Sequence, residues 1–240
     1  TQHISAYQTK HNGRMITLLD TPGHEAFAAL RQHGAVLTDV VIIVVAADDG
    51  VKPQTVEAIR FARSANAKIV VAINKIDKDT ANPQLVKTQL ASEHGLNPEE
   101  WGGDTVMVEV SAKTGQNLDK LLDMVLLVAD MEDLRADEDV PAEGLVIEAH
   151  MEIGRGAVVG LLVEHGQLKP AHYLVAGMAY GRVRTMSDFR GQTMKMAGPS
   201  TPVNVTGFKE LPQFGDSFRL AKNEKEARHL AQAARLMNIC

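Results

Sequence analysis

The chain has 240 residues, 45% of them hydrophobic, and a formal net charge of −5 at pH 7. Its length and apolar content suit two folded domains and argue against disorder, and the negative charge argues against broad attachment to nucleic acid. The longest apolar run, residues 40–47, is too short to span a bilayer, so we expect no membrane association.

Cysteine occurs once, as the last residue, Cys240. An internal disulfide framework is therefore excluded, which favours a reducing compartment, and we expect a cytoplasmic protein. The sequence begins with Thr1 inside a strand-like run, and we interpret the chain as an excised or processed fragment.

The first half of the chain predicts an α/β domain. Asn12-Gly13 lies between two strand-like runs, 3–10 and 14–20, and this dipeptide is a strong hairpin signal. Helical and strand-like segments then alternate, which predicts a mostly parallel sheet covered on both faces. The expected helices are 24–38, 53–66, 82–95 and 116–134, and the expected strands are 39–47, 68–75 and 105–112.

The second half of the chain has a different residue pattern. A polar, proline-containing linker at 135–144 is followed by short strand-like runs separated by glycines, which is typical of a small antiparallel β-barrel. The predicted strands are 144–153, 156–166, 172–177, 181–186, 193–198, 201–208 and 216–221, and residues 224–236 return to a helical pattern. We therefore predict domains at 1–138 and 139–222 and the start of a linker helix at 223–240.

Polar motifs follow three of the predicted strands: DTPGH at 20–24, NKID at 74–77 and SAK at 111–113. Since parallel strands point the same way, we expect all three motifs to open on one edge of the sheet. Each motif alone is weak, because Lys75 and Lys113 could be solvated lysines and Ser111 a helix cap. Their order and common position after a strand argue against coincidence.

The set resembles the motifs of GTP-binding proteins. By this resemblance Asp77 accepts hydrogen bonds from guanine N1–H and the exocyclic amine, which adenine cannot supply as a pair. Asn74 bridges the base to neighbouring loops, and the Lys75 stem lies along the ring. The Ala112 N–H meets guanine O6, while Ser111 braces the loop and Lys113 covers the other ring face.

The resemblance also assigns roles to the DTPGH motif. Asp20 would hold a magnesium ion, the Gly23 N–H would approach the terminal phosphate, and His24 would orient the attacking water. His24 stands where small signalling GTPases have glutamine. Whether it acts as a base or as a positioned donor stays open at this point.

His24 after DTPG, together with AADDGVKPQT at 46–55, is similar to the translational GTPases. Within them, TQHISAY, DTPGHEAF, VVAADDGVKPQTVEAI and AGPSTPVNVTG resemble bacterial-type translation initiation factor two. Thr1 falls on that family's switch-one threonine, which contacts magnesium and the terminal phosphate. Pro170, Ala171 and His172 depart from the Gly-Asp pair usual in the family, so this turn and any ribosome contact it makes could differ.

The pattern G-x-x-x-x-G-K-[ST], which cradles phosphates, does not occur in these 240 residues. By the resemblance, residues 1–138 are a partial GTP-binding domain of the P-loop GTPase type that lacks its first strand and phosphate loop. That strand would lie between 14–20 and 39–47, so we do not expect a gap-free six-stranded sheet. We expect this chain to bind GTP weakly and to hydrolyse it negligibly.

The resemblance implies GTP or GDP and Mg²⁺ as cofactors, and GTP hydrolysis by the intact factor. It implies ribosomal partners: small-subunit RNA for the barrel, large-subunit RNA near His24, and initiator tRNA through further domains. We expect a monomer. Two alternatives remain, a non-enzymatic ribosome-docking module and another translational GTPase such as an elongation factor. The first would use basic barrel residues, Arg155, Arg182, Arg184, Arg190 and Lys195, for each of which a solvated surface role is the simpler interpretation.

Overall fold

The computed structural model describes residues 5–21 and 37–237 and divides into two compact units. One unit contains residues 37–134, and the other contains residues 135–237 with most of residues 5–20. Each unit has its own hydrophobic core. The expected combination of a parallel α/β sheet and an all-β barrel is confirmed.

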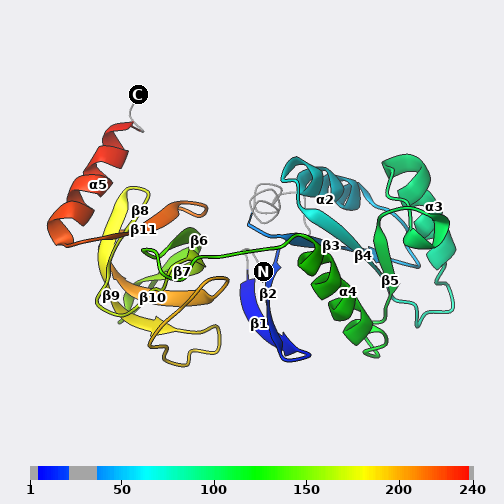
Figure 1. Ribbon diagram of the computed structural model, residues 1–240, viewed down its shortest axis with the longest axis horizontal. Coiled ribbons are helices and arrows are strands. Elements are labelled where there is room, and N and C mark those ends of the chain that lie inside the picture. The colour runs from blue at the N-terminus through cyan, green and yellow to red at the C-terminus, as the bar shows by residue number, and fades with distance from the viewer. Residues whose placement is uncertain (1–4, 22–36, 238–240) are drawn as a thin grey trace. The chain divides into compact units, whose positions relative to one another are not determined.

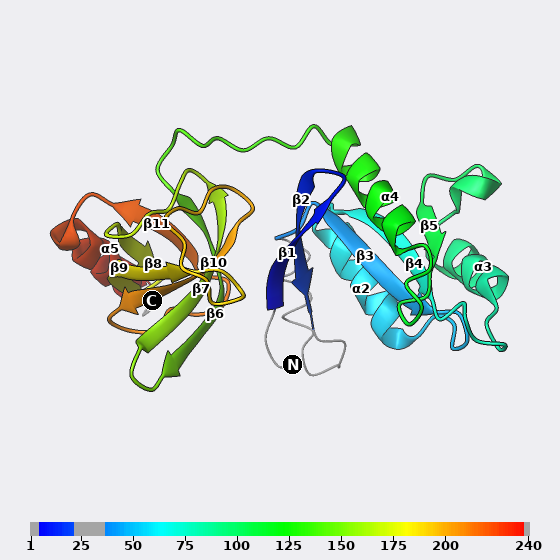
Figure 2. The same ribbon diagram turned by 90° about the horizontal axis from the view of Figure 1, so that it is seen from below.

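The α/β unit is built on a three-stranded parallel sheet in the order β3-β4-β5. The central strand β4 is buried on both faces, which explains its uninterrupted apolar sequence. Figure 2 shows α4 on one face of this sheet and α2 on the other. The elements are β3 (Val40–Ala46), α2 (Pro53–Ser64), β4 (Lys68–Asn74), α3 (Pro83–His94), the 3₁₀ helix η2 (Glu99–Trp101), β5 (Val106–Glu109) and α4 (Leu118–Met131).

Local signals explain where these helices begin and end. Pro53 and Pro83 occupy the first positions of α2 and α3, where no N–H is needed. Asn82 Oδ1 caps α3 by accepting a hydrogen bond from the Leu85 N–H at 3.1 Å, and Gly95, with φ +62°, ends it. The predicted helices at 53–66, 82–95 and 116–134 are confirmed. Of the helix predicted at 24–38, residues 24–36 lie outside the described residues.

The predicted hairpin is confirmed as a separate two-stranded sheet of β1 (Ser5–His11) and β2 (Arg14–Asp20). Asn12 and Gly13 have φ of +48° and +79°, as a type I′ turn requires. Within the described chain, β2 pairs with β1 and β3 pairs with β4, so β2 and β3 do not close on each other. Among residues 5–21 and 37–237, the strands do not form a gap-free six-stranded sheet, as expected.

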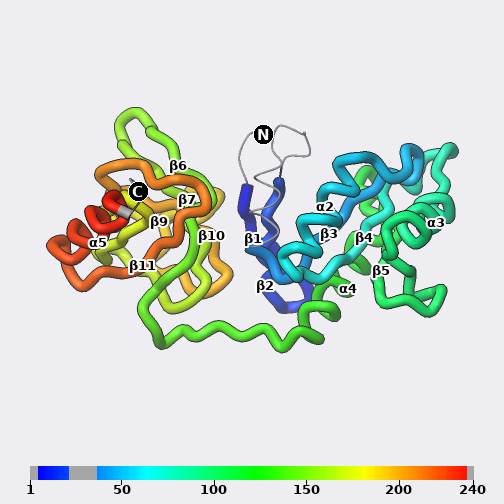
Figure 3. Tube along the Cα trace, turned by 90° about the horizontal axis from the view of Figure 1, so that it is seen from above, coloured from blue at the N-terminus to red at the C-terminus, as the bar shows by residue number. Residues whose placement is uncertain are grey.

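The second unit is a closed antiparallel barrel in the order β10-β7-β6-β11-β8-β9 (Figure 1). Seventeen buried residues form its core, among them Leu161, Leu174 and Phe218. Figure 3 follows its chain from β6 to β11. The strands are β6 (Glu143–Glu152), β7 (Gly156–His165), β8 (Tyr173–Ala176), β9 (Ala179–Ser187), β10 (Pro202–Phe208) and β11 (Ser217–Ala221).

One predicted barrel strand is wrong. Residues 193–198 make only isolated bridges, Thr193 with Ser187 and Ala197 with Leu168. The six barrel strands already have two neighbours each, so this segment finds no free edge along which to pair. The predicted terminal helix is present as α5 (Glu224–Met237), whose Ala227 and Ala231 pack against Val175.

Candidate functional site

The side chain of Asn74, at the end of β4, ties its own loop to the loop that follows β5. Its Oδ1 accepts hydrogen bonds from the backbone N–H groups of Lys75 at 2.7 Å and Ala112 at 2.9 Å. The Ile76 N–H donates to the Val110 carbonyl at 3.3 Å. Lys75 has φ +66°, an uncommon conformation for a long side chain, which turns the backbone directly after the strand. The structure thus brings the NKID and SAK motifs together.

A second link joins Ser111 to Asp77. Ser111 is fully buried, and its hydroxyl donates to Asp77 Oδ1 at 2.7 Å while accepting from the Thr114 N–H at 3.2 Å. The hydrogen bond from Ser111 holds the pKa of Asp77 below its ordinary value, and the charges of Lys113 and Lys78 act in the same direction. Asp77 is therefore an ionised, exposed carboxylate that can accept further hydrogen bonds.

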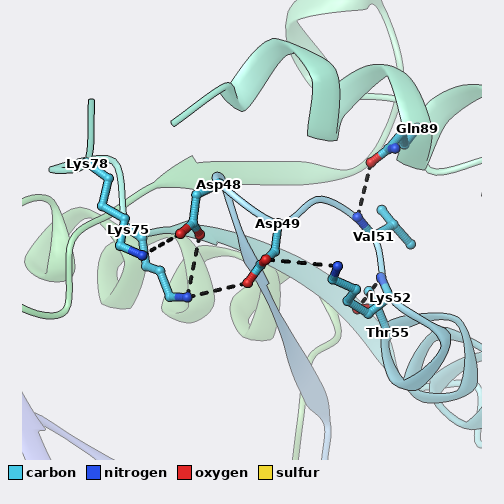
Figure 4. Close-up of polar contacts among 8 residues, drawn as sticks. All are labelled: Asp48, Asp49, Val51, Lys52, Thr55, Lys75, Lys78 and Gln89. Atoms are coloured by element: carbon cyan, nitrogen blue, oxygen red, sulfur yellow. Dashed lines mark hydrogen bonds and ion pairs between the residues drawn. The ribbon is translucent and has the colours of Figure 1, made fainter. Parts of the chain in front are cut away.

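The loop that follows β3 reaches the same edge of the sheet and was not singled out from the sequence as a site. Asp48 Oδ1 lies 3.5 Å from Lys75 Nζ, and Asp49 Oδ2 lies 3.6 Å from the same nitrogen. Asp48 Oδ2 also accepts a hydrogen bond from Lys78 Nζ (Figure 4). Applying the strand-end rule to β3, as to β4 and β5, would have found these carboxylates.

Asp48 is much less exposed than its neighbour, with a side-chain exposure of 13% against 53% for Asp49. The hydrogen bond from Lys78 lowers the pKa of Asp48, and the charge of Lys75 contributes, so Asp48 is ionised at neutral pH. Its Oδ1 atom is buried and has no hydrogen bond among the described residues. Lys75 is thus the cation that offsets the charge on this oxygen.

The DTPGH motif is placed only in part. Asp20 is the exposed last residue of β2, whereas Thr1, Gly23 and His24 lie outside the described residues. β2 pairs with β1 in a two-stranded sheet, whereas β4 and β5 belong to the parallel sheet. That the first motif shares a sheet edge with the other two stays a prediction.

Three of the five basic barrel residues have a partner within the barrel unit. The Arg155 guanidinium pairs with Glu152 at 3.0 Å, and those of Arg182 and Arg190 lie 5.7 Å and 5.2 Å from the ring centroids of Tyr173 and Phe189. Arg184 and Lys195 are exposed. Across residues 5–21 and 37–237, no cluster of three or more His, Cys, Asp or Glu is arranged to hold a metal, and no helix is long and apolar enough to cross a membrane.

The parallel sheet, its two linked loops and the following barrel can be compared with known proteins. The family model described as the elongation factor Tu GTP binding domain matches residues 1–130. The chain belongs to this family. A second model, elongation factor G domain 2, matches residues 141–221, the barrel.

Curated relatives agree with the resemblance seen in the motifs. Translation initiation factor IF-2 from Pelotomaculum thermopropionicum is 59% identical over 95% of this chain, and the protein of that name from Rubrobacter xylanophilus is 55% identical over 98%. The chain spans 23% and 34% of the lengths of these two relatives. The resemblance to bacterial-type translation initiation factor two is therefore confirmed.

Solved structures agree on the fold. GDP-bound aIF5B from Aeropyrum pernix matches 98% of this chain, and 51% of its own, with 25% identity and a TM-score of 0.74. Elongation factor SelB from Methanococcus maripaludis, in complex with a GTP analogue, matches 92% of this chain and 50% of its own, with 22% identity and a TM-score of 0.72.

Proposed function

We propose that this chain supplies the guanine-reading edge and the first barrel of a translation initiation factor GTPase. The observation that carries the proposal is the pair of links Asn74–Ala112 and Ser111–Asp77, which hold the NKID and SAK loops in one network. The ionised Asp77 carboxylate matches the two adjacent donors of guanine, N1–H and the 2-amino group. Adenine has no such pair, so the same carboxylate would reject it.

The remaining base contacts follow from the same network. The Ala112 N–H already donates a hydrogen bond to Asn74 Oδ1. When the base binds, this N–H would donate to guanine O6, either in place of Asn74 Oδ1 or shared with it. The hydrogen bond from Ser111 would fix the orientation of the Asp77 carboxylate, so that its other oxygen faces the base. Lys75 and Lys113 would cover the two faces of the ring with their stems.

The phosphate end of the site rests on residues whose roles stay proposals. Asp20 and Thr1 would hold Mg²⁺, which when bound neutralises phosphate charge, and the Gly23 N–H would donate to the terminal phosphate. His24 would orient the attacking water. Because the phosphate-cradling pattern does not occur in these 240 residues, we expect weak nucleotide binding and negligible hydrolysis by this chain.

The partners proposed for the intact factor are ribosomal. The barrel, residues 139–222, would contact small-subunit RNA, and the partial GTP-binding domain, residues 1–138, would face large-subunit RNA near His24. Initiator tRNA would bind through further domains of the intact factor. We propose a cytoplasmic monomer. A steep loss of ribosome affinity with rising salt would support phosphate contacts, whereas a flat salt dependence would contradict them.

A titration of the ¹⁵N-labelled 240-residue protein tests base recognition. GDP at millimolar concentration should shift the amide resonances of Ser111 and Ala112, whereas ADP, the matched control, should not. Equal shifts with both nucleotides, or none with GDP, would refute the proposal. Nanomolar binding of a fluorescent GTP analogue would refute the expected weakness.

Asp77→Asn separates base reading from a structural role. The amide of Asn donates to the 2-oxo group of xanthine but meets the guanine amine donor to donor. We therefore expect GDP affinity to fall about ten- to hundredfold and xanthosine diphosphate to bind better than GDP. A variant that loses both nucleotides equally would indicate a structural role for Asp77.

A further inference from the structure

The side chain of Lys75, which directly follows β4, is held by two carboxylates on the loop after the neighbouring strand β3. Its backbone leaves β4 in a left-handed conformation, and its ammonium lies between the carboxylates of Asp48 and Asp49 on the loop after β3 (Figure 4). The four-carbon stem therefore has both ends fixed, one by the backbone and one by ion pairs. An untethered lysine would sample many rotamers, so this arrangement removes freedom before any ligand arrives.

The loop that carries Asp48 is itself braced. The Asp49 and Gly50 N–H groups donate to the Ala46 carbonyl at 3.2 Å and 3.0 Å, and the Ala47 N–H donates to the Asn74 carbonyl at 2.8 Å. On the far side, the Val51 N–H donates to the Gln89 side chain of α3 at 3.0 Å (Figure 4). The position of the Asp48 carboxylate is thus set by the sheet and by α3.

Of the two acids, Asp48 has the stronger influence on Lys75. Their distances to Lys75 Nζ are nearly equal, but Asp48 is 13% exposed and Asp49 is 53% exposed, so water screens Asp48 less. Asp49 is also shared with Lys52, whose Nζ lies 3.9 Å away. The buried Oδ1 of Asp48 has no hydrogen bond among the described residues, so its nearest compensation is Lys75.

We propose that Asp48 is a positioning residue for the base site: by anchoring the Lys75 ammonium, it holds the lysine stem where it covers one face of the bound purine. The inference rests on the proposed function and deepens it. Lys75 then contributes its apolar stem to the nucleotide, while its charge is used within the protein. Because the stem is ordered in advance, less freedom is lost on binding and affinity is higher.

Asp48→Asn tests this role, with Asp79→Asn as the matched charge control. Asp79 follows the same motif, is exposed, and has no ion pair in the described part of the chain. The GDP dissociation constant, measured by amide shifts in the 240-residue protein, should rise about two- to fivefold in Asp48→Asn, a range set by partly exposed ion pairs. It should stay unchanged in Asp79→Asn. The same spectra report whether each variant is folded.

A double-mutant cycle distinguishes positioning of Lys75 from a general effect on the loop. In a Lys75→Met background, Asp48→Asn should cause no further loss, because the anchored group is already gone. Lys78→Met, which removes the other partner of Asp48, should leave GDP affinity within twofold of the wild type.

Three results would overturn the inference: unchanged affinity in Asp48→Asn, a full further loss in the Lys75→Met background, or a Lys78→Met variant as weak as Asp48→Asn. They are distinguishable from failure of the proposed function itself. In that case the wild-type protein would show no GDP-specific shifts, and both proposals would fall.

Discussion

Ala171→Gly should stabilise the barrel. Ala171 has φ +71°, follows Pro170, and lies in a turn closed by a hydrogen bond from the His172 N–H to the Lys169 carbonyl at 3.4 Å. Proline at the second position and a positive φ at the third are the features of a type II turn, in which the third position favours glycine. The departure noted in the sequence therefore still forms a turn, but with an alanine in a left-handed conformation.

The magnitude follows from two opposing contributions. A left-handed conformation costs a residue with a Cβ about 1–2 kcal/mol. Glycine adds backbone freedom to the unfolded chain, which costs about 0.4–1 kcal/mol. Ala171 is exposed, so no packing is lost, and the net gain in unfolding free energy is roughly 0.5–1 kcal/mol.

Urea unfolding checks this value. The single tryptophan, Trp101, lies in the α/β unit, so barrel unfolding should be followed through resonances of barrel core residues. With an m-value of about 1.5 kcal/mol/M, the midpoint should rise by roughly 0.3–0.7 M at constant slope. As a control, Ala233→Gly within α5 should destabilise, by about 1 kcal/mol. An unchanged or lower midpoint for Ala171→Gly would refute the assigned strain.

Three further changes test the barrel and the site. Burial and the charge of Lys169 lower the pKa of His172, whose Nδ1 accepts a hydrogen bond from the Lys169 N–H. The unfolded state therefore binds more protons, and barrel stability should fall as pH drops through the unfolded pKa of about 6.5. A His172→Gln variant should lose that pH dependence in urea titrations. Gly207→Ala should destabilise the barrel by about 3 kcal/mol or more, since φ is +117° and the new Cβ would lie 1.9 Å from the Arg182 carbonyl oxygen. A urea unfolding midpoint equal to that of the wild type would contradict the β9–β10 geometry. Asn74→Ala should move the Ala112 amide resonance and weaken GDP binding severalfold, because the Lys75 and Ala112 N–H groups lose their acceptor. An unchanged Ala112 amide resonance would contradict the link between the two loops.

Local structure was largely predictable from the sequence. Asn12-Gly13 predicted the hairpin turn, and Pro53, Pro83 and Gly95 mark helix ends, because the backbone preferences of these residues act over a few positions. The segment at 193–198 has the residue pattern of a strand yet pairs only through isolated bridges. Whether a strand-like segment pairs depends on a free neighbouring edge, which residue pattern alone does not reveal.

The candidate site divides in the same way. The residue types of NKID and SAK, and their positions after strands, were enough to predict a guanine-reading edge. That Asn74 Oδ1 joins the two loops, and that Asp48 holds Lys75 and Lys78, could not be read from the spacing. These contacts join residues 27 to 38 positions apart, and only the register of β3, β4 and β5 brings them within hydrogen-bonding distance.

The sequence by itself determined most of the order of strands and helices, the hairpin turn and the chemistry available at each strand end, since these depend on residues near one another in the chain. Only the tertiary structure decided which strand ends meet. It brings the loops after β3, β4 and β5 to one edge and leaves β2 in a separate sheet. The physical reason is that strand pairing satisfies backbone hydrogen bonds between distant segments, and a strand joins a sheet only where a neighbour offers its edge.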